Sequence, residues 1–269
     1  MRFLQLYIEN ETLTGPSYNF HLLNLDPSMA SAMTSEIQNG PILRAVCRMY
    51  LPSGRANGFL CVSKRSFFGE EDLYLLATNN RVISDISIRS LKTCIFEFPF
   101  LPNLKQFQFA DENIEFAWTD EKFDASVIEI KKGMAARMMQ QGARFLEIGA
   151  PVFGRNASAV EDKEGISLFI VNVDILPIMS DGKIFYRSTL IPTSCGAPLV
   201  NMQGIAIGMH KGNNLYGLCE AVNLELVLQI YFQQRNNSLE SARQGMLNDA
   251  CPSTSANLTL EKLLIIQPT

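Results

Sequence analysis

Cys195 stands in a segment whose residue types suit nucleophilic chemistry. The run PTSCGAPLV, residues 192–200, places this thiol in a tight turn between two β-prone segments. A glycine at position 196 lets the chain bend without the steric cost of a Cβ atom. Small neighbours leave the backbone N–H groups of Thr193, Ser194 and Cys195 free to point at an oxyanion. The stretch therefore predicts a nucleophile turn with these three residues as its oxyanion loop.

The longer segment PTSCGAPLVNMQGIAIGMHKG resembles the nucleophile region of chymotrypsin-like proteases. The pattern of that family is Gly-x-Ser-Gly-Gly/Ala-Pro-Leu/Val, then a turn, then a Gly-x-x-x-Gly strand that walls the primary specificity pocket. Cys195 stands where those enzymes carry serine, as it does in the picornavirus-type main proteases. The resemblance extends over Ile42–Gln234 and implies a polypeptide substrate or a protein ligand.

Two further segments resemble the other catalytic motifs of this family. GFLCVSKRSFFGEEDLYLLATNNRVIS, residues 58–84, is similar to the segment that carries the general-base histidine, but it has Arg81 at the histidine position. FDASVIEI, residues 123–130, resembles the strand of the orienting aspartate and places Asp124 there. The residues alone also allow Asp124 to be an ordinary carboxylate at the start of a strand.

With Arg81 at the histidine position, the chain lacks the general base that the resemblance would otherwise imply. An arginine has a pKa above about 12, so it cannot take a proton from a thiol near neutral pH or give one to a leaving amine. It could lower the pKa of Cys195 by Coulomb attraction. We expect Asp124 to pair with Arg81 instead of orienting an imidazole. Loss of the base also leaves open that Cys195 is an inert, buried thiol.

His210 is the candidate for substrate recognition. It lies fifteen residues after Cys195, and the resemblance implies that it lines the primary pocket and binds a Gln or Glu side chain of the substrate. The alternative is a surface histidine without a role. Family members often place a threonine five residues before the nucleophile; this chain has Leu190 there and Thr189 one position away. The other histidine, His21, lies outside every matching motif, and we do not expect it to be the base.

Short β-prone runs separated by turns predict an all-β fold. With the resemblance, the expected architecture is two six-stranded β-barrels of the chymotrypsin-like type, an N-terminal extension and a C-terminal helix. The predicted divisions are an extension at 1–41, a first barrel at 42–130, a linker at 131–144, a second barrel with the helix at 145–235, and a flexible tail at 236–269.

Composition excludes several classes of function. The 269 residues are 47% apolar and carry a net charge of −4 with scattered Lys and Arg, so we expect no nucleic-acid partner. No run reaches the roughly 18 apolar residues that span a bilayer, and no membrane partner is expected. The six cysteines lack paired spacing, which argues against zinc and disulfides and favours an intracellular protein without metal or cofactor. We expect Cys47, Cys61 and Cys219 to be small buried hydrophobic residues.

Three functions follow from these features. The first is a degenerate protease that keeps a peptide-binding cleft but has lost hydrolysis with its base. The second is a cysteine endopeptidase that cleaves after Gln or Glu, in which the base comes from elsewhere or Arg81 replaces a parental histidine. The third is a partner-docking protein that uses the apolar patch Leu258–Ile266. The sequence favours the first.

Overall fold

The structure is a computed structural model that describes residues 40–51, 54–64, 72–84, 94–101, 106–152, 156–163, 167–180, 182–188, 195–213 and 217–249. Several sequence predictions lie outside these residues. They are the N-terminal extension up to residue 39, His21, Thr189, Leu190, Thr193, Ser194 and the patch Leu258–Ile266.

The first half of the chain forms an eight-stranded sheet. Its strands are β1 (Val46–Leu51), β2 (Gly54–Ser63), β3 (Leu73–Thr78), β4 (Ile95–Glu97), β5 (Gln106–Phe107), β6 (Ile114–Asp120), β7 (Ala125–Ile130) and β8 (Leu146–Glu147). They follow the order β5-β4-β1-β2-β3-β7-β6, and β8 adds to β2 in parallel. A short 3₁₀ helix at Asp111–Asn113 precedes β6.

The second half forms a closed barrel. Its strands are β9 (Asn156–Lys163), β10 (Ser167–Ser180), β11 (Lys183–Arg187), β12 (Pro198–Asn201), β13 (Ala206–Asn213) and β14 (Cys219–Asn223). The hydrogen-bonded order β10-β11-β14-β13-β12-β9 closes on itself. Ala157, Val173, Ile184, Leu199 and Ile207 are among the side chains that fill its interior.

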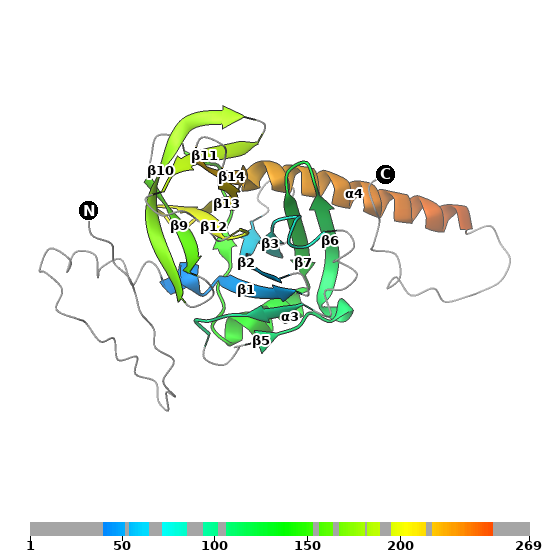
Figure 1. Ribbon diagram of the computed structural model, residues 1–269. Helices are drawn as coiled ribbons and strands as arrows, with labels where there is room; N and C mark the ends of the chain where they lie inside the picture. Colours follow the sequence, from blue (N-terminus) through cyan, green and yellow to red (C-terminus); the bar gives the residue numbers. More distant parts are fainter. Residues whose placement is uncertain are drawn as a thin grey trace, which may run out of the picture.

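Two helices complete the fold. α3 (Lys132–Gln140) lies within the predicted linker and packs Met134, Ala135 and Met138 against the first sheet. α4 (Leu224–Asp249) leaves the barrel after β14 and runs past β7 and β6 of the first sheet (Figure 1).

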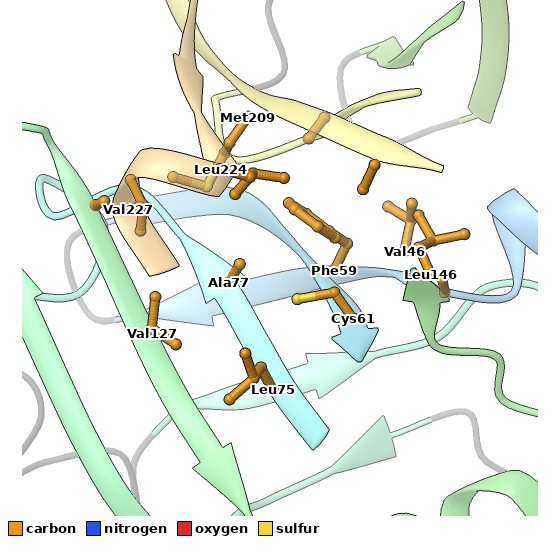
Figure 2. Close-up of a cluster of buried hydrophobic side chains, with 14 of the residues drawn as sticks. Val46, Phe59, Cys61, Leu75, Ala77, Val127, Leu146, Met209, Leu224 and Val227 are labelled. Atoms are coloured by element: carbon orange, nitrogen blue, oxygen red, sulfur yellow. The ribbon is translucent and has the colours of Figure 1, made fainter. Parts of the chain in front are cut away.

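One hydrophobic core joins the two halves. Phe59 and Cys61 of β2 point into it from the first sheet, because alternate residues of a strand face the same side. Met209 of β13 enters it from the barrel, and Leu224 and Val227 enter it from the start of α4 (Figure 2). The two halves are therefore packed against each other through one continuous core.

The predicted all-β fold with a C-terminal helix is confirmed, and three details differ from the prediction. The first half is an eight-stranded sheet with β5 and β6 at its two ends, where a closed six-stranded barrel was expected. Leu146 and Glu147, assigned to the second barrel, pair with β2 because the chain crosses the first sheet before it reaches the barrel. Residues 236–249, assigned to a flexible tail, continue α4 to Asp249.

Candidate functional site

Asp124 occupies the tight turn that joins β6 to β7. Its backbone has φ of 52°, in the left-handed region that residues other than glycine and asparagine rarely adopt. Two bonds hold the turn: the Asp124 N–H donates to the Glu121 carbonyl at 3.1 Å, and the Phe123 N–H donates to Asp120 Oδ1 at 2.9 Å. The turn aims the buried carboxylate of Asp124 at the loop that follows β3.

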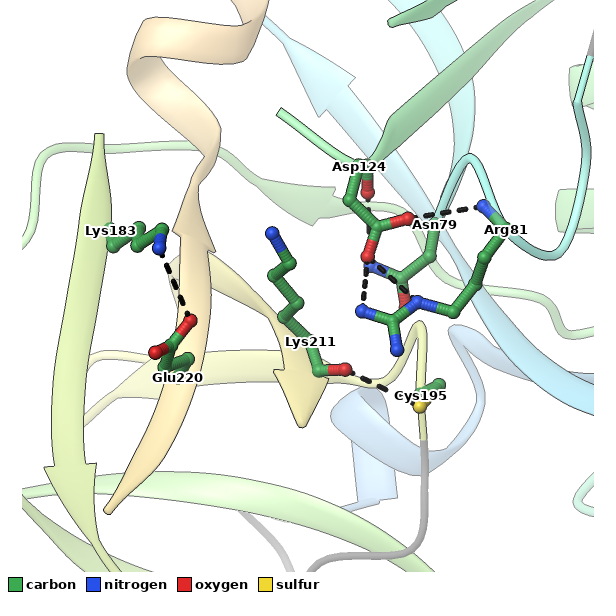
Figure 3. A network of polar contacts seen from close by, with 7 residues as sticks. All are labelled: Asn79, Arg81, Asp124, Lys183, Cys195, Lys211 and Glu220. Carbon is green, nitrogen blue, oxygen red and sulfur yellow. Dashed lines mark hydrogen bonds and ion pairs between the residues drawn. The ribbon is translucent and has the colours of Figure 1, made fainter. Parts of the chain in front are cut away.

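Arg81 lies in that loop and binds the carboxylate through both backbone and side chain. Its N–H donates to Asp124 Oδ1 at 3.0 Å, its Nε donates to Oδ2 at 2.8 Å, and Nη2 also contacts Oδ2 (Figure 3). Asn79 adds a bond from Nδ2 to the Asp124 carbonyl at 3.1 Å. The ion pair expected from the sequence is therefore present, and the hydrogen bond to Asp124 raises the pKa of Arg81 above its ordinary value.

The turn that carries Cys195 is fixed by the first sheet and by β13. The Asn57 N–H of β2 donates to the Cys195 carbonyl at 3.0 Å, and the Gly196 N–H donates to the His210 carbonyl at 3.0 Å. Thr78 Oγ1 donates a hydrogen bond to the Asn57 carbonyl at 2.8 Å. Gly196 has φ of 85°, and a Cβ atom there would lie 2.0 Å from the Asn57 carbonyl oxygen. Only glycine fits this close approach of two backbones.

Burial has the largest effect on the pKa of the Cys195 thiol. Desolvation raises its pKa, Arg81 lowers the pKa, Asp124 raises it, and the net direction is upward. The Sγ donates to the Lys211 carbonyl at 3.4 Å (Figure 3). The expected lowering of the Cys195 pKa by Arg81 is present, but burial outweighs it and the neighbouring carboxylate of Asp124 opposes it.

His210 lies inside the barrel. Its side chain is buried, and its Nδ1 lies 2.6 Å from the hydroxyl of Tyr186 on β11. The alternative of a surface histidine is therefore wrong. Its role as a wall of the primary pocket stays a prediction, as do the parts assigned to Thr189, Thr193 and Ser194.

The remaining cysteines fit the structural role predicted for them. Cys47, Cys61 and Cys219 are buried, and burial raises the pKa of Cys47 and Cys61 well above the ordinary value. The five described cysteines are all free thiols.

Four residues of the site escaped the sequence analysis. Asn57, Thr78 and Tyr186 act through contacts with residues far along the chain, which no local pattern reports. Lys211 directly follows His210 in the sequence, but its bond with Cys195 is made through its backbone carbonyl, which no residue type reports.

Other features of the described residues lie away from Cys195. A hollow of about 550 Å³ opens at the far end of β3 and β7. Its lining comprises Asp72, Leu73, Tyr74, Glu115, Glu129, Ile130, Lys131, Lys132 and Arg235. Within the described ranges, no group of His, Cys, Asp and Glu side chains could hold a metal ion, and no helix is long and apolar enough to cross a membrane.

Comparison with known proteins supports the fold. Neither a protein-family model nor a curated protein matches the chain. Among solved structures, a serine endoprotease from Yersinia pestis superposes with a TM-score of 0.52 at 15% identity, covering 72% of this chain and 64% of that one. Deg5 gives 0.52 at 14% identity, covering 76% and 94%. An inactive form of the protease Rv3671c gives 0.50 at 12% identity, covering 76% and 93%. Identities this low show the fold alone, which is chymotrypsin-like, as the sequence predicted.

Proposed function

We propose that this protein binds polypeptides in the cleft beside Cys195 and has lost hydrolysis with its general base. The observation that carries the proposal is the Arg81–Asp124 ion pair. It joins the positions that the histidine and the orienting aspartate of a protease would take. A guanidinium held by a carboxylate stays protonated throughout the physiological range, so it neither activates the thiol nor protonates a leaving amine.

The end of strand β13 supports the peptide-binding part. On the side of β12, the pairing of β13 ends where His210 bonds with Gly196 and Ala197. On the side of β14, pairing continues to Asn213. In the described part of the chain, the backbone of Lys211–Asn213 thus has a strand partner on one side only. An extended peptide can add to such an edge through main-chain hydrogen bonds.

The state of the thiol supports the loss of hydrolysis. Amide cleavage by cysteine needs a thiolate nucleophile and an acid for the leaving group. Burial raises the pKa of Cys195 and so keeps the thiol protonated. Among the described residues, the only histidine is His210, and it is buried against Tyr186.

A single substitution tests this proposal. Arg81→His keeps the backbone bond to Asp124 Oδ1 and places an imidazole on the same Cβ, within the reach now spanned by the arginine Nε. We expect the parent chain to bind Gln- or Glu-containing peptides without turnover, and the variant to cleave them. Mass spectrometry of the products measures cleavage, and fluorescence anisotropy measures binding. The double variant Arg81→His/Cys195→Ala is the matched control and should be inactive.

A second candidate function is an active cysteine endopeptidase of the picornavirus type that cleaves after Gln or Glu. The buried His210–Tyr186 contact favours it, since a phenol on Nδ1 fixes the orientation of an imidazole that recognises a carboxamide. Turnover by the parent chain that disappears with Cys195→Ala would establish this function and overturn the loss of hydrolysis. A parent chain that binds no such peptide would contradict the proposed peptide-binding cleft.

A further inference from the structure

A small hollow beside Cys195 is lined by three lysines. It lies between the β6–β7 turn of the first sheet and the barrel strands β11, β13 and β14. Its lining residues are Lys122, Phe123, Gly182, Lys183, Lys211 and Val222. The hollow therefore spans the cleft between the two halves of the molecule.

Lys211 is the central cation of this hollow. Its carbonyl accepts the hydrogen bond from the Cys195 thiol, so the residue adjoins the nucleophile position. Lys211 lines the hollow, whereas the side chain of His210 is buried with its Nδ1 against the Tyr186 hydroxyl. In Figure 3 its side chain extends between the Lys183–Glu220 pair and the Arg81–Asp124 pair.

The other charges leave Lys211 available. Lys183 is paired with Glu220 at 3.6 Å, and Lys122 lies 5.4 Å from the ring centre of Phe123. No acid lies within ion-pair distance of the Lys211 ammonium among the described residues. A lysine that pairs with no acid of the described residues is positioned to bind an anion from outside the chain.

The sign of the local charge strengthens this argument. The described residues that line the hollow include three cations, Lys122, Lys183 and Lys211, and no acid, whereas the whole chain has a net charge of −4. Positive charge confined to a cleft of an acidic protein attracts a small anionic group but disfavours a long polyanion that also crosses the acidic surface.

We propose that Lys211, assisted by Lys122, forms a subsite that binds the carboxylate side chain of an acidic residue in the bound polypeptide. This inference rests on the proposed peptide-binding function. It adds that the cleft selects acidic sequences through the ammonium of Lys211 and not through the buried His210.

Alkylation of Cys195 tests the subsite without a peptide. Iodoacetate and iodoacetamide have the same leaving group and differ in charge, so the ratio of their rates at Cys195 reports the local field. We expect Lys211→Met to lower the iodoacetate-to-iodoacetamide ratio about three- to tenfold, and Lys211→Arg to retain it. Lys131→Met, in the distant hollow by α3, is the matched control and should leave the ratio unchanged. Peptide mapping assigns the rates to Cys195. A ratio that does not respond to Lys211→Met overturns the inference.

Paired peptides then test the acidic selectivity. Octapeptides with one Glu moved through each position are compared with the same peptides carrying Gln, by fluorescence anisotropy. We expect about three- to tenfold tighter binding of Glu at one position, lost in Lys211→Met and kept in Lys211→Arg.

Binding without a Glu preference overturns the subsite and leaves the cleft proposal standing. A Lys211-dependent alkylation ratio with no peptide binding overturns the proposed function instead. Tighter binding of a single-stranded oligonucleotide than of every Glu peptide, at equal salt, would assign the lysines to nucleic acid.

Discussion

At the scale of single residues, Arg81 binds the carboxylate of Asp124 through both its backbone and its side chain. Its backbone N–H donates to Asp124 Oδ1 at 3.0 Å. The guanidinium then adds a charge-assisted bond to Oδ2. Because Asp124 neutralises much of the cation, Arg81 is a weak activator of Cys195, and burial sets the direction of the thiol pKa.

The alkylation rate of Cys195 should follow these opposing charges. Arg81 lowers the thiol pKa and Asp124 raises it. Arg81→Gln should therefore raise the pKa further, leave less thiolate at neutral pH and slow alkylation by iodoacetamide about two- to tenfold. Asp124→Asn should do the reverse. Intact mass spectrometry against pH, with the other thiols as internal controls, measures both changes. A parent chain whose rate rises with a midpoint below the ordinary value of 9.0 contradicts the upward shift.

At the scale of elements, the Cys195 turn depends on β2 for its shape. The Asn57 backbone both donates to the Cys195 carbonyl and packs its own carbonyl against Gly196. Thr78 of β3 fixes that carbonyl from the other side. The Cys195 turn of the barrel is thus positioned by two strands of the first sheet.

Substitution of Gly196 should separate backbone strain from steric conflict. Gly196→Ala meets the Asn57 carbonyl oxygen at 2.0 Å and Thr78 Oγ1 at 2.8 Å, in addition to its positive φ. Gly204→Ala has a similar φ of 79° but nothing within 4 Å, so it reports strain alone. We expect a loss of unfolding free energy of about 1 kcal/mol for Gly204→Ala and of about 3 kcal/mol or more for Gly196→Ala. Urea denaturation measures both. Equal losses would refute the close approach at Gly196.

At the scale of the whole molecule, α4 ties the end of the chain back to the first sheet. The buried Glu129 of β7 accepts a bond from the Tyr231 hydroxyl at 2.5 Å and two from Arg235, at 2.7 Å from Nε and 3.0 Å from Nη2. Tyr231 also packs edge-on against Phe116 and Trp118 of β6. The barrel and the sheet are therefore linked by α4 as well as by their shared core.

Removing one charge of this link should destabilise the fold more than removing both. Arg235→Met leaves the Glu129 carboxylate buried without its cation, and we expect a loss of about 2–4 kcal/mol in unfolding free energy. The double variant Arg235→Met/Glu129→Gln should recover part of that loss. Lys64→Met, in the exposed pair with Glu147, is the matched control and should change stability little. Chemical denaturation measures all three. A double variant no more stable than Arg235→Met would contradict an unpaired charge as the cause.

The sequence by itself determined the all-β class and predicted the pairing of Arg81 with Asp124, which the structure contains. The all-β class follows from local signals, namely β-prone runs and turn residues, whereas the pairing follows from the resemblance together with the opposite charges of the two side chains. The extent of α4 beyond residue 235 was missed because the polar run at 236–238 was taken as the end of the helix, although Leu239, Ala242 and Met246 recur at helical spacing beyond it.

Only the tertiary structure decided how these residues act together. It showed that burial outweighs Arg81 at Cys195, that Tyr186 meets His210, and that the Cys195 thiol donates a hydrogen bond to the Lys211 carbonyl. The physical reason is that desolvation and Coulomb interactions depend on distances between atoms, and these residues are far apart along the chain. Asn57 and Cys195, for example, meet only when β2 packs beside the barrel. A sequence read along its length carries the types of the reacting groups, whereas the folded chain sets their separations and their exposure to water.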